Sequence, residues 1–166
     1  KLAKDLSEAT ARWYSDSYGW DIPAERVHHV PDVIAAFELA IEHFTTPGSA
    51  VIVPPPAYMP FLMVPPMRDR RVIEVPSIEV DGRWVMDLDA VAQAFRDGGE
   101  MLVLCNPHNP TGTVATRDEL LAIADTVTAL RARPGSFGLV GANGGALHKY
   151  SAGVYSTSPA TWQAGD

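Results

Sequence analysis

The sequence has little cysteine, few positive charges and no long apolar run. Its one cysteine, Cys105, cannot form a disulfide within the chain, and this favours a reducing compartment. No apolar run reaches the roughly 18 residues that a membrane-spanning helix needs. Lysine and arginine number 13 against 20 acidic residues, and the net charge of -7 disfavours a nucleic-acid partner. We therefore expect a cytoplasmic protein with no membrane or nucleic-acid partner.

The composition is that of an ordinary globular domain. The 166 residues are 46% hydrophobic and 20% charged, which is enough for one sizeable core. The chain begins at Lys1 rather than methionine, inside a helical pattern, and shows no secretion signal. We therefore expect a fragment of a longer protein, with a natural fusion or a chimera as the alternatives.

Helical and strand patterns alternate along the chain and predict an α/β fold with a mostly parallel sheet covered by helices. Helices are expected from Leu2 to Gly19, over 33–44 behind a cap at Asp32, through Phe95 behind Asp87 or Asp89, and over 116–130, which has capping-box form. Strands are expected at 26–30, 50–53, 72–75, 101–105 and 137–143, with a hairpin between 78–80 and 84–86.

A proline- and asparagine-rich loop follows the strand at 101–105. It reads CNPHNPTG over residues 105–112, and its prolines stiffen the chain where open α/β sheets place their ligands. Such a loop can hold an asparagine amide in a fixed direction. The alternative is a turn whose asparagines bond only their own backbone.

This loop resembles the NPxNPTG motif of pyridoxal-phosphate-dependent enzymes of the aminotransferase class I/II family. The central histidine is typical of the cystathionine β-lyase-like C–S lyase group, and the resemblance covers about residues 2–124. It implies a partial large domain of the aminotransferase type (fold type I), a pyridoxal 5'-phosphate cofactor, an amino acid substrate and a homodimer. By this resemblance Asn109 would hydrogen-bond the ring oxygen of the cofactor, and Asn106 would shape the loop.

Three further residues match cofactor-binding positions of the family. Asp32 and Val33 lie where the family has a phosphate-cradling turn at a helix start, and free N–H groups there favour an anion. A carboxylate would repel phosphate, so Asp32 alternatively acts as a helix cap alone. Tyr58 matches the aromatic residue that stacks on the cofactor ring, and its alternative is a plain loop aromatic. No metal site is predicted.

The catalytic residues of the family are incomplete. Its Schiff-base lysine and the aspartate that faces the pyridine nitrogen should both follow the Asn109 loop, but the strand expected at 137–143 contains no acid. The later candidate is Lys149, which lies too near that strand for the lyase pattern and is alternatively a solvated side chain. The resemblance therefore implies a C–S lyase or aminotransferase that is a fragment or inactive, and leaves open whether this chain is an enzyme.

The tail resembles a different family. Residues 128–163 are similar to the C-terminal region of thiolase-like acetyl-CoA acetyltransferases, through an ANGG turn at 142–145 and the segment 149–157. We expect a transferase-like large domain at 1–126 and a thiolase-like segment at 127–166 packed on the same domain. The alternative functions are a non-catalytic scaffold or dimerisation module, which uses the apolar stretch 60–67, and a thiolase-like acyl-CoA-binding protein.

Overall fold

The computed structural model describes residues 1–130, 138–141 and 153–156 and separates into two compact units, Lys1–Asp32 and Val33–Asp166. The first unit contains α1 (Leu2–Tyr18) and a short 3-10 helix, η1 (Ala24–Arg26). Gly19 ends α1 in the left-handed conformation, with φ of 65°, which a residue without a Cβ adopts at low cost. This confirms the helix that was expected to close at Gly19.

The prediction of a strand at 26–30 is wrong. Residues 27–30 have no regular structure, and no described strand pairs with them. A strand is stabilised by a neighbour that takes its backbone hydrogen bonds. Here a side chain of α1 replaces that neighbour, because the hydroxyl of Ser7 donates to the Val27 carbonyl at 2.9 Å and lies 3.2 Å from His29 Nε2.

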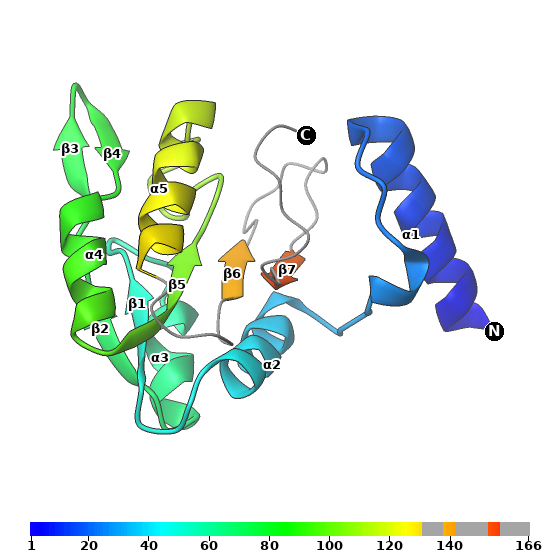
Figure 1. The fold of residues 1–166 in the computed structure, drawn as a ribbon, viewed down its shortest axis with the longest axis horizontal. Coiled ribbons are helices and arrows are strands. Elements are labelled where there is room, and N and C mark those ends of the chain that lie inside the picture. The colour runs from blue at the N-terminus through cyan, green and yellow to red at the C-terminus, as the bar shows by residue number, and fades with distance from the viewer. Residues whose placement is uncertain (131–137, 142–152, 157–166) are drawn as a thin grey trace. The chain divides into compact units, whose positions relative to one another are not determined.

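The second unit is built on a five-stranded sheet in the order β2-β1-β5-β6-β7 (Figure 1). The strands are β1 (Ala50–Val53), β2 (Arg71–Glu74), β5 (Gly99–Leu104), β6 (Gly138–Gly141) and β7 (Gly153–Ser156). β1 runs parallel to β2 and β5, β6 runs parallel to β5, and β7 is antiparallel to β6. The α/β fold with a mostly parallel sheet is confirmed, and both described strands of the 127–166 segment belong to that sheet.

Helices cover both faces of the sheet because buried strand residues alternate between two apolar clusters. The helices are α2 (Val33–Phe44), α3 (Pro60–Met67), α4 (Leu88–Arg96) and α5 (Arg117–Ala129). The first cluster joins α2 and α3 to one face through Phe37, Ile41, Phe61, Val64, Val51, Val53, Met101, Val103 and Cys105. The second joins α4 and α5 to the other face through Val91, Ala94, Ile123, Val127, Ile52 and Leu102. None of the helices described has the length and apolar character to cross a membrane.

Local signals for turns and caps agree with the structure. The hairpin of β3 (Ile78–Val80) and β4 (Arg83–Val85) turns at Asp81 and Gly82, which have φ of 49° and 75°. Asp87 caps α4 by accepting from the Ala90 N–H at 3.0 Å, which decides between the two aspartates considered. The capping box of α5 is also present, with reciprocal bonds between Thr116 and Glu119.

Candidate functional site

A cavity of about 410 Å³ lies at the sheet edge where the parallel strands β1 and β5 end. Its walls come from those strand ends, the β3–β4 hairpin, the loop after β5 and the first turns of α5. Apolar walls include Phe61, Trp84, Leu88, Val103 and Ile123, and polar groups include Asn106, His108, Arg83 and Glu119. The cavity thus lies where open α/β sheets hold ligands.

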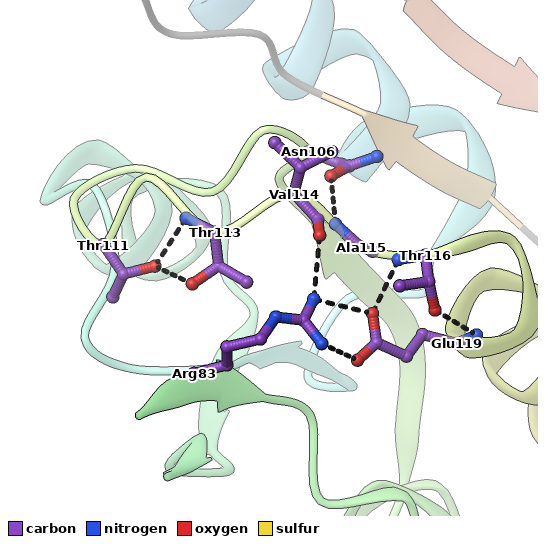
Figure 2. Close-up of polar contacts among 8 residues, drawn as sticks. All are labelled: Arg83, Asn106, Thr111, Thr113, Val114, Ala115, Thr116 and Glu119. Atoms are coloured by element: carbon purple, nitrogen blue, oxygen red, sulfur yellow. Dashed lines mark hydrogen bonds and ion pairs between the residues drawn. The ribbon is translucent and has the colours of Figure 1, made fainter. Parts of the chain in front are cut away.

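The loop after β5 is closed on itself by hydrogen bonds. Asn106 Oδ1 accepts from the Ala115 N–H at 3.0 Å and joins the two ends of the loop (Figure 2). Within the loop, the His108 N–H donates to the Thr113 carbonyl at 2.7 Å, and the Gly112 N–H donates to the His108 carbonyl at 2.6 Å. These bonds give the segment one defined path, and Asn106 shapes it.

Asn109 sits half-buried at the turn of this loop. Its backbone N–H donates to the sulfur of Cys105 at 3.4 Å, and the peptide bonds at Asn106–Pro107 and Asn109–Pro110 are cis. The side-chain amide of Asn109 makes no hydrogen bond to another described residue. The backbone is therefore held while the amide stays available to a ligand.

Tyr58 lies in the proline-rich turn between β1 and α3. Its ring packs edge-to-face on the ring of Phe61, with centroids 5.6 Å apart and planes at 84°. The side chain is nevertheless 43% exposed, so much of the ring surface is accessible. An aromatic ring held at its edge in this way can still stack on a flat partner.

Val33 is the first residue of α2 and is half-buried. The first N–H groups of a helix have no acceptor within the helix, so they can hold an anion. Asp32, which precedes it, is exposed and is the last residue of the first unit.

Three of the predicted cofactor residues border one apolar cluster. Val33 packs against the cluster of α2 and α3, to which Tyr58 is joined through the Phe61 ring and Asn109 through the Cys105 sulfur. None of the three lines the cavity, which is lined instead by their neighbours Ala57, Asn106 and His108. The cavity and the predicted cofactor residues are therefore adjacent parts of the same sheet edge.

An ion pair fixes the hairpin to the exit of the loop, as Figure 2 shows. Arg83 donates to both carboxylate oxygens of Glu119 at 3.0 and 3.2 Å, and also to the Val114 carbonyl at 3.0 Å. The hydrogen bond from Arg83, followed by that from the Thr116 N–H, lowers the pKa of Glu119. The capping-box pattern that begins at Thr116 includes Glu119, whereas no sequence pattern indicates Arg83.

His108 is the second residue that sequence reasoning missed as part of the site. Its Nδ1 lies 2.8 Å from the hydroxyl of Thr111. Burial lowers the pKa of the ring, partly offset by a hydrogen bond with the backbone carbonyl of Pro54. The histidine at the centre of the motif is the sequence signal that points to this residue.

The described part of the second unit contains no lysine that could form the Schiff base of the family. Lys149 lies outside the described residues, and the other two lysines, Lys1 and Lys4, belong to the first unit. Among described residues, no group of three or more His, Cys, Asp or Glu side chains is arranged to hold a metal ion.

Known proteins similar to this chain are cystathionine β-lyases and related pyridoxal-phosphate proteins. The chain is 40% identical to cystathionine beta-lyase of Corynebacterium glutamicum over 131 residues, which cover 79% of this chain and 34% of that protein. It is 33% identical over 119 residues to cystathionine beta-lyase PatB of Bacillus subtilis, covering 71% and 31%. The chain thus spans about a third of the length of these curated relatives.

Solved structures share the fold. Cystalysin from Treponema denticola, whose crystal structure contains a pyridoxal 5'-phosphate cofactor, has a TM-score of 0.70 and 31% identity, covering 78% of this chain and 32% of that chain. The second unit is therefore part of an aminotransferase-type (fold type I) large domain. The family model for aminotransferase class I and II matches residues 1–134. Fold, motif and family model agree, and the chain belongs to the aminotransferase class I and II family.

Proposed function

We propose that this chain carries the ring-binding part of a pyridoxal-phosphate-dependent C–S lyase or aminotransferase that acts on amino acids. The observation that carries the proposal is the closed loop after β5, which holds the Asn109 backbone and leaves its amide available at the sheet edge. The named activities of the relatives support it. Because the chain spans about a third of those relatives, turnover is proposed for the complete protein.

The residues present fit the cofactor chemically. The first turn of α2 at Val33, with Asp32 before it, would hold the phosphate through backbone N–H groups. The Tyr58 ring would stack on the pyridine ring, and the Asn109 amide would donate to the ring oxygen. When bound, pyridoxal phosphate supplies an electron sink for negative charge at the α-carbon of an amino acid.

The described residues of the second unit include no lysine that could anchor the cofactor covalently. Lys149 stays a proposal as an anchor, and borohydride reduction with cofactor present, followed by peptide mapping, tests it. A pyridoxyl adduct on that residue would support the role, and its absence would remove it.

Absorbance titration with pyridoxal phosphate tests the proposed function. We expect saturable spectral change for the wild-type chain and roughly tenfold weaker binding for Asn109→Ala, since one hydrogen bond to a ligand contributes about 1.5 kcal/mol. The matched control is His43→Gln, which changes an exposed residue of α2. No spectral change and no rise in melting temperature with the wild-type chain would contradict the proposal.

A dimerisation role is favoured by exposed methionines along α3 and just before it. Met59, Met63 and Met67 recur at a spacing of four residues and are 65%, 53% and 74% exposed. Residues at this spacing share one helix face, and flexible methionines suit an association surface. We propose that the chain forms a homodimer through this face. If the chain is inactive, the homodimer would act as a scaffold. A monomer at every concentration in sedimentation would contradict it.

The thiolase-like assignment of 127–166 stays a prediction. It proposes an acyl-CoA-binding segment, and acetyl-CoA binding measured by calorimetry tests it directly. Heat of binding that survives in the Asn109→Ala variant would show that the acyl-CoA site does not depend on the Asn109 amide. An absence of binding would leave the segment a structural addition to the sheet.

A further inference from the structure

The β3–β4 hairpin is a part of the site to which the proposed cofactor contacts give no role. Arg83 and Trp84 of the hairpin line the same cavity as Asn106 and His108 of the loop after β5 (residues 105–116). In the described part of the chain, the hairpin forms a two-stranded sheet of its own, separate from the five-stranded sheet. Its connection to the loop therefore depends on side chains.

The backbone of the hairpin is fixed at its base and along its length. The N–H of Ser77, the residue before β3, donates to the Pro55 carbonyl at 2.7 Å in the turn that follows β1. Val80 and Arg83 are cross-strand partners at the far end of the hairpin. The Arg83 side chain therefore extends from a defined backbone position.

From this position, the Arg83 guanidinium bonds both the exit of the loop and the start of α5 (Figure 2). Its Nη2 donates to the Val114 carbonyl at 3.0 Å and to Glu119 Oε2 at 3.2 Å, and its Nη1 donates to Glu119 Oε1 at 3.0 Å. Glu119 Oε2 also accepts from the Thr116 N–H at 2.6 Å. A planar guanidinium suits these acceptors, because its donors are held in a rigid fork that matches a carboxylate.

The exit of the loop is next to the turn that carries Asn109. Thr113 directly precedes Val114, and its carbonyl accepts from the His108 N–H at 2.7 Å. His108 in turn directly precedes Asn109, whose own N–H donates to the Cys105 sulfur at 3.4 Å. A displacement of Val114 would therefore disturb the backbone bond beside Asn109.

The exposure of the ion pair favours a local role over a global one. The side chains of Arg83 and Glu119 are 44% and 30% exposed, and exposed ion pairs contribute little to the stability of a whole domain. The bond to the Val114 carbonyl, in contrast, fixes one backbone position at the loop exit. Loss of the Arg83 side chain should therefore affect the loop more than the sheet.

We infer that Arg83 is a positioning residue, which holds the exit of the loop after β5 and thereby keeps the Asn109 amide in place at the sheet edge. The inference rests on the proposed function for its purpose, since Asn109 is the residue proposed to bond the cofactor ring. Arg83 itself is assigned no contact with the cofactor. Because the hold on the loop exists in the chain without cofactor, it can be measured separately from cofactor binding.

Native-state hydrogen exchange on the full chain tests the hold on the loop. The amides of His108 and Ala115 report on the loop, and the Leu102 amide in β5 reports on global unfolding. The variants are Arg83→Met, which removes the donors but keeps a long side chain, and Arg83→Lys, which keeps the charge without the planar fork. The matched control is Arg96→Met, which removes the same charge from an exposed residue of α4.

We expect Arg83→Met to accelerate exchange at His108 and Ala115 about fivefold relative to Leu102, which is the effect of about one net hydrogen bond. Arg83→Lys should recover part of this loss, and the control should match wild type. Unchanged exchange at the two loop amides of Arg83→Met would overturn the inference. Equal acceleration at Leu102 would also overturn it, because Arg83 would then stabilise the whole domain.

A double-mutant cycle on the affinity for pyridoxal phosphate tests whether Arg83 acts through Asn109. Arg83→Met should weaken binding about fivefold, and the double variant with Asn109→Ala should bind no more weakly than Asn109→Ala alone. An unchanged affinity of Arg83→Met, or additive losses in the double variant, would overturn the inference. An absence of binding by the wild-type chain would contradict the proposed function alone, and the exchange rates would still decide whether Arg83 holds the loop.

Discussion

Replacing Gly99 with alanine should destabilise the sheet that carries the site. Gly99 begins β5 and is buried, and a Cβ there would lie 2.6 Å from Ile52 Cδ1, 2.7 Å from Ile52 Cγ1 and 2.9 Å from the Ala94 carbonyl oxygen. Ile52 is fully buried and the carbonyl belongs to the backbone of α4, so neither neighbour can move freely. The new methyl group must displace the strand or the helix.

The magnitude follows from two opposing effects. Forcing a methyl group into a packed core costs about 1–3 kcal/mol, whereas the lower chain entropy of unfolded alanine returns about 0.4–1 kcal/mol. We expect a net loss of about 1–2 kcal/mol, which lowers the melting temperature by roughly 3–6 °C for a chain of this size.

Urea denaturation followed by circular dichroism measures this loss, and a double-mutant cycle with Ile52→Val tests its cause. Removing Cδ1 relieves one of the close contacts, so the double variant should be more stable than the sum of the single effects by about 0.5–1 kcal/mol. Strict additivity of Gly99→Ala and Ile52→Val would refute the steric explanation.

Three further predictions concern the ties around the site and the core. The hydrogen bonds to Glu119 lower its pKa in the folded chain. The stabilisation from this carboxylate is therefore present above its unfolded pKa and is lost as pH falls through its folded pKa. Arg83→Met should flatten this loss of stability in a denaturation series below pH of about 5. Arg70 is 8% exposed and donates to acceptors at the end of α2, so Arg70→Met should lower the free energy of unfolding by about 1–3 kcal/mol in urea denaturation. An unchanged free energy would contradict this prediction. Asn106→Ala should speed amide exchange at Ala115 by about tenfold, and an unchanged rate would show that the bond does not hold the loop.

Local signals made much of the fold predictable. The αL glycine at Gly19, the hairpin at Asp81 and the capping box at Thr116 each depend on residues a few positions apart, so the sequence contains the whole interaction. The segment at 26–30 failed because strand formation depends on a neighbour that the pattern does not reveal. Its apolar residues were compatible with a strand, but the bond from Ser7 took the place of a ladder.

The candidate site was predictable in its parts but not in its arrangement. Tyr58 and Asn109 were found through motif resemblance, while their attachment to one apolar cluster depends on contacts through Phe61 and Cys105. The Arg83 pair joins residues 36 positions apart, and no local pattern encodes that distance. Contacts of this kind are decided by how the sheet brings loop ends together.

The single cysteine allows the site to be labelled selectively. Cys105 is 7% exposed, lines the cavity and contacts the Asn109 backbone through its sulfur. Because the sequence contains no other thiol, a fluorinated alkylating reagent would label one position, next to the proposed ligand and nowhere else. The rate of that labelling would measure how often the sheet edge opens, and the fluorine signal would report what enters it.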